Sequence, residues 1–515
     1  MTRTLAGALR RASAAAAVLA ALGPSSVLGL PGVFAFDARV EARSTQTSVS
    51  AIEAPGPAAG DAVRLPSSSL LESRLRAGGS LTWHLGNAWL QQLQLSVQAD
   101  LFAGPRSADG IPSRLDSDAL FAADASPWAL DQHLVRRFAV EADGRWGRVA
   151  VGRQVSTWGL GLLAQSGDDE PYQFGLKRRG AVVDRAQIAL LPAGLVGDGS
   201  ALAYLPLALV FAADDVVDDD LASKRAGDSA QQLVAAALLR YPELEVGAYG
   251  VRRWQTDAKK LGLEATVGDV YARWKHAFGK TRVQVATEWL TIRGTTTWFR
   301  TATSPDELNV DQFGGLVRVR VERGAFGLQL DGGVASGDDS PFDDTISNFK
   351  MARDLRVGLV LFGEMWRRQS ANIVANLADP RFSGGAPAGA DRFASNGSAT
   401  GARWLSATLR AKVDRVTFLT GVLAADAPVP LVDPHRTGLA GGALTGPRGG
   451  AASRDLGWEL DAAVQYDQPL GAGLSLRARL DLGVAFPGMA FAAADGTPSA
   501  AAGAAVGQLA LRGHW

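Results

Sequence analysis

Few residues of this chain have the types and spacings that catalysis or metal binding requires. Its five histidines are His84, His133, His276, His435 and His514, and they lie far apart. No metal-ligand spacing, nucleophile elbow or phosphate-binding loop accompanies them. The one local grouping that a hydrolase could use is His84 with Ser80 and Thr82 on one phase of a strand, because such sites depend on geometry rather than on chain order. We expect no enzyme, no cofactor and no metal site.

Acidic side chains gather in stretches that read as loops. "SGDDEPYQFG" (166–175) and "SGDDSPFDD" (336–344) echo each other, and a third group comprises Asp214, Asp215, Asp218, Asp219 and Asp220. Oxygen-rich loops suit calcium, but none has the twelve-residue EF-hand pattern. We expect a solvated acidic rim on outer loops, and leave calcium binding open as the alternative.

Other charged residues recur at every second position of long alternating stretches. Arg318, Arg320 and Glu322 alternate with valines, and "LQLSVQADLF" (93–102) alternates in the same way. A period of two places apolar and polar side chains on opposite faces of a strand. Such a strand fits a soluble sandwich, whose polar face meets bulk water, or a membrane barrel, whose apolar face meets lipid.

The connections between these stretches favour the barrel. Tight turns such as Gly86-Asn87, 143–147 and Gly279-Lys280 alternate with long loops. The long loops are expected at 103–132, 155–177, 214–230, 337–352 and 427–453. Outer-membrane barrels have short periplasmic turns and long extracellular loops. The sequence therefore predicts an all-β fold, a single transmembrane antiparallel barrel of about 18 strands.

Strands are expected near 36–44, 72–85, 88–102, 133–143, 146–154, 178–191, 202–213, 231–241, 243–253, 261–277, 280–294, 309–323, 325–336, 353–364, 402–414, 415–426, 454–467, 473–486 and 504–515. This odd count conflicts with the even strand number of bacterial barrels, so the range is 18 to 20. The conflict centres on 365–401, where Trp366, Ile373 and Leu377 have helical spacing. This segment is expected either to insert into the lumen as a plug or to form an ordinary loop.

The two ends of the chain fit an exported barrel. Arg3, Arg10 and Arg11 precede an apolar stretch and a small-residue site at Ala35, which predicts a signal peptide over 1–35 and a barrel over 36–515. The last strand ends in Trp515 on its apolar phase, where an aromatic residue would meet the lipid interface. We expect contacts with the barrel-insertion machinery and with outer-membrane lipids and lipopolysaccharide, and localisation in a Gram-negative outer membrane.

Composition excludes other classes of protein. The 515 residues carry 52 basic and 52 acidic side chains and no cysteine. A formal net charge of zero gives no field that would attract nucleic acid, and without cysteine there is no disulfide framework. The alternating stretches continue along the whole length, which favours one large sheet over several separate cores. We expect no nucleic-acid partner.

One late hairpin resembles a known family. Leu456, Gly457, Glu459, Leu460 and Asp461 begin a strand, and Phe486, Pro487 and Gly488 end the next. This pattern is similar to that of the alginate-export family of outer-membrane porins. The resemblance implies a monomeric barrel of about eighteen strands with an aqueous channel, but it identifies no solute.

If the apolar phase faces lipid, the charged phase faces the lumen. The candidate pore-lining residues are Arg39, Arg74, Arg76, Asp100, Arg282, Glu288, Arg318, Arg320, Asp331, Arg410, Glu459, Asp461, Arg477, Arg479 and Asp481. Rings of arginine select anions in some pores, whereas arginines paired with carboxylates would only hold the wall in shape. We expect a porin for hydrophilic solutes, with anions one candidate class. The alternative is a structural or adhesive barrel with a plugged lumen.

Overall fold

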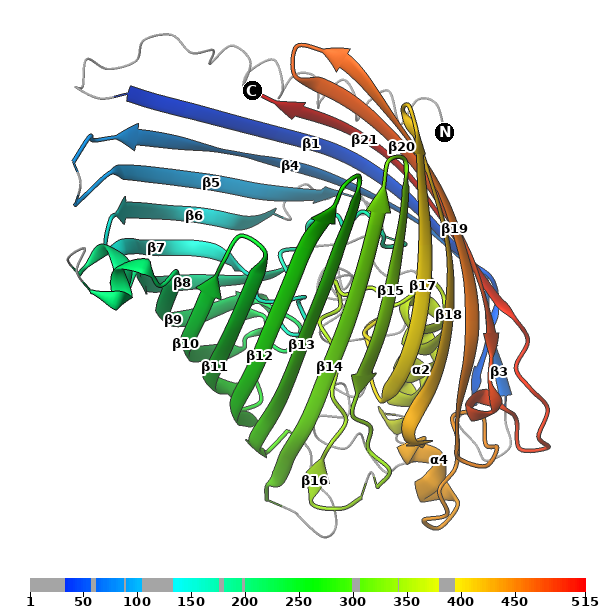
Figure 1. Cartoon of the computed structure of the whole chain (residues 1–515). Helices are drawn as coiled ribbons and strands as arrows, with labels where there is room; N and C mark the ends of the chain where they lie inside the picture. The colour runs from blue at the N-terminus through cyan, green and yellow to red at the C-terminus, as the bar shows by residue number, and fades with distance from the viewer. Residues whose placement is uncertain are drawn as a thin grey trace.

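The strands form one closed barrel (Figure 1). The structure is a computed structural model that describes residues 33–56, 62–87, 89–103, 133–175, 180–196, 200–298, 306–340, 342–378 and 394–515. Within these ranges eighteen antiparallel strands pair in chain order, and β21 pairs with β1 to close the sheet. The predicted barrel is confirmed.

The wall strands have the following bounds: β1 (Val33–Val49), β4 (Ser68–His84), β5 (Gln92–Ala103), β6 (His133–Gly144), β7 (Gly147–Ser156), β8 (Ala181–Leu190), β9 (Leu207–Asp218), β10 (Ser229–Arg240), β11 (Leu244–Thr256), β12 (Gly262–Phe278), β13 (Thr281–Thr296), β14 (Leu308–Arg323), β15 (Phe326–Ala335), β17 (Ala402–Val413), β18 (Val416–Leu431), β19 (Ser453–Gly471), β20 (Leu474–Pro487) and β21 (Ala502–His514). The short strand β16 (Thr345–Ile346) pairs in parallel with the loop end of β14, and β2 (Ile52–Pro55) and β3 (Ala62–Leu65) form a separate hairpin.

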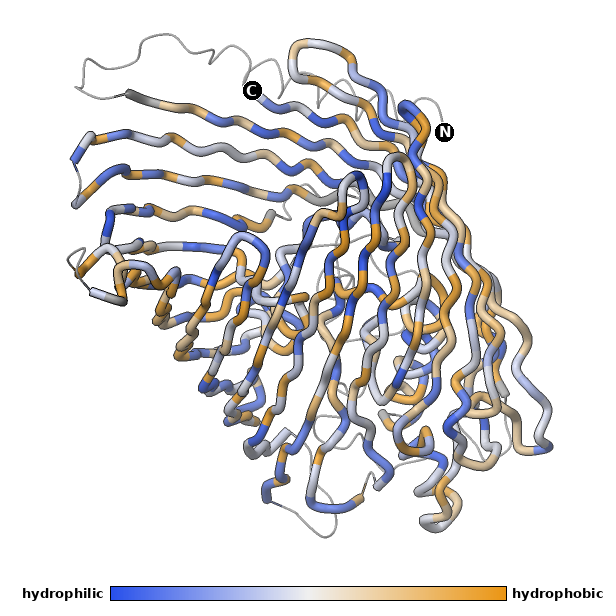
Figure 2. The backbone as a smooth tube through the Cα atoms, viewed as in Figure 1, coloured by the Kyte–Doolittle hydropathy of each residue, from blue (hydrophilic) through white to orange (hydrophobic). Residues whose placement is uncertain are grey.

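The burial pattern is the reverse of that in a soluble protein. Phe138 is 61% exposed and Leu405 is 66% exposed, whereas Asp100, Glu459 and Asp481 are 0% exposed. Figure 2 shows the hydrophobic and hydrophilic residues alternating along the wall strands. An exposed apolar belt around a charged interior is the arrangement that lipid outside and water inside would stabilise.

The predicted strand at 353–364 is wrong. These residues form irregular backbone that leads into a π-helical turn (Leu361–Trp366) and then α2 (Arg367–Ala378). β15 pairs directly with β17, which removes the odd strand from the wall. The apolar run of 357–362 had suggested a wall strand, but its side chains are buried within the barrel's apolar cluster.

The two ends of the barrel differ as expected. β1 begins and β21 ends at the end that carries the short turns (Figure 1). The opposite end carries the other long connections, including the β2–β3 hairpin and α4 (Pro434–Leu439), whereas the long connection from β8 to β9 lies at the short-turn end. Among the described residues no helix has the length and apolar character to cross a bilayer. The signal peptide stays a prediction, because residues 1–32 lie outside the described ranges, as do residues 104–132 of one expected loop.

Candidate functional site

Two connections fold into the barrel and fill much of its cross-section. The first inserted segment (157–175) contacts wall residues on opposite sides: Trp158 binds Asp269 of β12, Tyr172 binds Glu322 of β14, and Gly175 binds Asp481 of β20. Contacts with strands this far apart around the wall require a path through the interior. The second inserted segment (347–378) includes α2 and touches the first, since the amide of Ala352 donates to the carbonyl of Leu162.

A wall carboxylate anchors the first inserted segment. Glu288 of β13, 1% exposed, accepts hydrogen bonds from the consecutive amides of Leu160, Gly161 and Leu162. The last two bonds measure 3.0 and 3.3 Å. Consecutive amides that converge on one anion form a backbone nest. Gly159 just before them has φ +53°, and a Cβ there would lie 2.5 Å from the Glu288 carboxylate.

A second wall carboxylate anchors the second inserted segment in the same way. Glu459 of β19 accepts hydrogen bonds from the amides of Leu359, Val360 and Leu361, the last two at 2.8 and 2.6 Å. Gly358 precedes these amides with φ +71°, and a Cβ there would lie 2.8 Å from Glu459. Each segment thus presents a glycine and three amides to one buried glutamate, which replaces the hydration that this carboxylate loses on burial.

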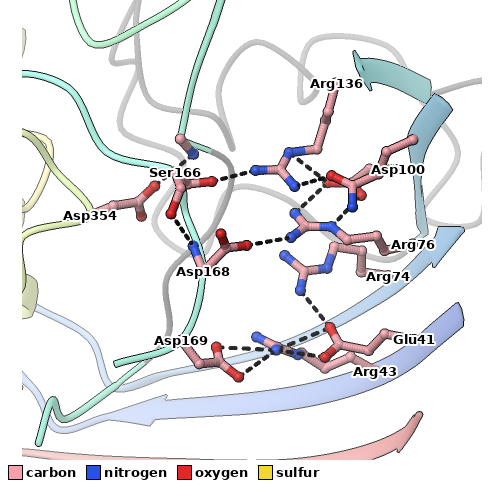
Figure 3. Close-up of polar contacts among 12 residues, drawn as sticks. Glu41, Arg43, Arg74, Arg76, Asp100, Arg136, Ser166, Asp168, Asp169 and Asp354 are labelled. Carbon is pink, nitrogen blue, oxygen red and sulfur yellow. Dashed lines mark hydrogen bonds and ion pairs between the residues drawn. The ribbon is translucent and has the colours of Figure 1, made fainter. Parts of the chain in front are cut away.

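Three consecutive acidic residues of the first inserted segment bind arginines of the wall, and Figure 3 shows two of them, Asp168 and Asp169. Asp169 accepts from Arg43 of β1 at 3.1 Å and from Arg512 of β21 at 2.6 Å. Asp168 lies 3.7 Å from Arg76 of β4, and Glu170 lies 3.0 Å from Arg320 of β14. Burial opposes ionisation of Asp169, but the guanidinium groups beside it outweigh burial and lower its pKa to about 2. The segment is therefore held electrostatically as well as by its backbone.

Further arginines pair with carboxylates of the wall itself. Arg76 binds Asp100 through two bonds of 2.7 and 2.8 Å, and Arg318 binds Asp331 through two bonds of 2.8 Å. Paired, bidentate contacts of this kind fix guanidinium orientation. Arg479 also binds both carboxylate oxygens of Asp481, whereas single bonds join Arg74 to Glu41 and Arg477 to Asp467.

One aromatic ring of the first inserted segment, that of Tyr172, contacts charged residues of the wall. Tyr172 lies between two guanidinium groups, 5.3 Å from that of Arg320 and 5.9 Å from that of Arg410. Burial and the hydrogen bond to Glu322 raise the pKa of Tyr172 to about 12. Arg410 therefore contacts the first inserted segment through a cation–π interaction, whereas Arg320 also forms an ion pair with that segment.

All fifteen residues predicted to line a pore share the inward-facing phase of their strands. The structure brings most of them into contact with the inserted segments or with one another, as described above. Arg39 and Arg282 stand apart near the short-turn end, with side chains 68% and 77% exposed; Arg39 pairs with Asp37, and Arg282 lies 3.7 Å from Glu322. These residues thus lie on the inner face of the wall, and that they line a solute path stays a prediction; their contacts with chain inside the lumen were not predicted.

Sequence reasoning missed Arg136 because it lies at a break in the alternation. The register shifts between Gln98 and Ala99 opposite this position, and the displaced Arg136, 1% exposed, donates to Gln98 and to the carbonyl of Ser166. Glu288 and Glu459 were predicted to line the pore, but sequence reasoning did not predict that they anchor the inserted segments. The signal that could have found them is the repeated glycine-leucine pattern of 159–162 and 358–361.

The expected acidic rim is wrong in two of its three parts. Residues 166–170 lie inside the barrel against the arginines, because the charged wall stabilises them there. Asp214, Asp215 and Asp218 belong to β9 rather than to a loop, whereas Asp219 and Asp220 do lie in the connection after β9, where they bind Arg253 and Arg353 instead of forming a solvated rim. Asp339, Asp343 and Asp344 do lie exposed at the loop end. Within the described ranges no group of three or more metal-binding side chains comes together.

The comparison with solved structures agrees with the observed fold. No family model and no curated protein sequence matches the chain. Among solved structures, the outer membrane protein OpdK of Pseudomonas aeruginosa matches with a TM-score of 0.50 and 10% identity, covering 93% of this chain and 99% of that one. OccK2 (OpdF) of the same organism matches with a TM-score of 0.49 and 11% identity, covering 93% and 97%. The chain therefore has the fold of a large outer-membrane β-barrel.

Proposed function

We propose that the chain is a Gram-negative outer-membrane channel that lets hydrophilic solutes, anions among them, cross by diffusion or export. The observation that carries this proposal is the closed wall of eighteen strands with apolar side chains outside and charged side chains inside. A barrel of this size leaves an aqueous interior unless chain fills it. The fifteen inward-facing candidates named above are proposed to line the solute path.

A second function, a structural barrel with a closed lumen, has one observation in its favour. Both inserted segments are bound to the wall at several points, and the arginines they contact are already paired with carboxylates. Arginines paired in this way are less available to a passing anion. The two candidates differ in whether solutes pass the inserted segments.

Ion conductance separates the two candidates. The purified full chain is reconstituted into planar bilayers, and single-channel current and reversal potential are measured in a KCl gradient. Steady current supports the channel, and the reversal potential reports its preference between chloride and potassium. A barrel that inserts, migrates in its folded form on detergent gels and yet carries no current supports the structural role.

The expected contacts with lipids and with the insertion machinery are also proposals. Outer-membrane lipids and lipopolysaccharide would contact the exposed apolar belt. The insertion machinery would engage β21, whose end is closed by paired backbone bonds between Ala38 and Trp515. The finer resemblance to alginate exporters rests on one hairpin, and absence of enzymatic activity rests on the sequence motifs alone.

A further inference from the structure

Near the loop end of the barrel the usual pattern of the wall is reversed, so that apolar side chains face inward and polar side chains face outward. On the loop-side part of β12 the apolar Leu263, Ala265 and Val267 face inward, while Glu264 and Thr266 face outward and are exposed. β12 has 17 residues, whereas about 9 to 11 suffice to cross a bilayer. The loop-side end of β12 therefore extends beyond the lipid bilayer. Contact with lipid does not explain the apolar residues on its inner face.

Packing accounts for part of this inner face. Ile292 of β13 and Val310 of β14 continue it, and they belong to one buried cluster with Phe349 and Met351 of the second inserted segment. The packing is incomplete, because a cavity of about 290 Å³ remains between these strands and that segment. Leu263, Ala265, Val267, Ile292, Val310 and Phe349 line it.

The charged side chains around the cavity balance one another. They are three acids, Asp219, Asp220 and Asp338, and three bases, Arg253, Lys350 and Arg353. Asp219 accepts from Arg253 at 2.6 Å and Asp220 from Arg353 at 3.1 Å. Asp338 accepts from the amides of Ser340 and Ser347 at 3.0 and 3.2 Å. The cavity therefore differs from the surroundings of Asp169, where arginines gather, and it favours an uncharged bound molecule.

Tyr249 presents a hydroxyl group to the cavity. Tyr249 of β11 lines it and stacks on Trp158 at a ring-centroid distance of 5.0 Å. Its hydroxyl makes no hydrogen bond to any other residue that the structure describes. Tyr249 is only partly buried, so its hydroxyl is accessible from the cavity and can donate a hydrogen bond to an acceptor oxygen of a bound molecule.

We propose that the cavity binds a small, uncharged, mainly apolar solute of one or two rings that accepts a hydrogen bond from Tyr249. An engineered apolar cavity of about 150 Å³ binds benzene, so a cavity of about 290 Å³ has room for a substituted ring. This inference rests on the proposed channel. It adds that the loop-side half of the channel admits this class of solute.

Binding of methyl benzoate tests the proposal. The full chain in lipid nanodiscs is equilibrated with the ester by dialysis, and uptake into empty nanodiscs is subtracted. We expect saturable binding of one equivalent, with the benzoate anion at least tenfold weaker. Absence of saturable binding, or tighter binding of the anion, overturns the proposal.

Variants separate the cavity from the rest of the barrel. Ala265→Leu fills the cavity and is expected to weaken ester binding at least tenfold, whereas Ala272→Leu makes the same change on the outer face of β12 and leaves binding unchanged. Tyr249→Phe removes one neutral hydrogen bond and should weaken binding about two- to tenfold. Binding unaffected by both Ala265→Leu and Tyr249→Phe overturns the assignment of the site.

Conductance of the same preparation distinguishes this inference from the channel on which it rests. Saturable ester binding to a barrel that carries no current overturns the channel and its solute class but keeps the binding site. Steady current without ester binding overturns the binding site and keeps the channel.

Discussion

Replacing Glu459 with alanine should release the second inserted segment. Glu459 is fully buried and accepts three backbone hydrogen bonds, from the amides of Leu359, Val360 and Leu361. A hydrogen bond to a charged group contributes about 1.5 to 3 kcal/mol, and the three contributions are not additive. Removing one partner of a buried charged contact typically costs about 3 to 5 kcal/mol.

A loss of about 3 kcal/mol lowers the ratio of inserted to released segment roughly 150-fold. Other contacts still hold this segment, among them the bond from Arg368 of α2 to the carbonyl of Pro66. We therefore expect partial rather than complete release, seen as frequent openings to a higher conductance level in planar bilayers. Limited proteolysis should also cut Glu459→Ala within 353–378 faster than the wild-type chain.

Glu264→Ala is the matched control, because Glu264 lies on the outer face of β12 and binds Arg252 and Trp254 there. Its conductance and cleavage should equal those of the wild-type chain. If Glu459→Ala folds, shown by heat-dependent migration on gels, and keeps both wild-type conductance and wild-type cleavage, the anchoring role of Glu459 is refuted.

Four further changes test other parts of the structure. Gly358→Ala should resemble Glu459→Ala more weakly, since φ is +71° and the new Cβ would approach the carboxylate; conductance traces check this. Asp169→Asn should shift the reversal potential toward anions by freeing charge on the wall arginines, while the outward-facing Asp311→Asn should not; an equal shift in both contradicts the pairing. Because the pKa of Asp169 is lowered to about 2, its contribution is present above its ordinary pKa of 3.8 and is lost as pH falls toward 2. In the wild-type chain the same shift of the reversal potential should therefore appear only below about pH 4, and onset near pH 6 would exclude Asp169 as the cause. Deletion of Trp515 removes the backbone bonds to Ala38 and the indole bond to Ala472, so folding yield into liposomes should fall, and an unchanged yield would show that this closure contributes little.

The sequence by itself determined the wall of the barrel. Strand periodicity is local, so the alternation of Arg318 and Arg320 with valines identified both the strand and its two faces without knowledge of any partner. The asymmetry of turns and loops then determined the class of barrel, because hairpin connections are also local. The same reasoning placed all fifteen candidate residues on the inner face.

Only the tertiary structure decided what fills the lumen. Residues 166–170 read as a solvated loop, because nothing local shows that Arg43 and Arg512, from opposite ends of the chain, meet Asp169. The run at 357–362 read as a strand, because apolar side chains buried against an inner wall follow no different pattern from those of a short strand. Burial of these segments depends on long-range ion pairs and on Glu288 and Glu459, and such contacts exist only once the barrel has closed.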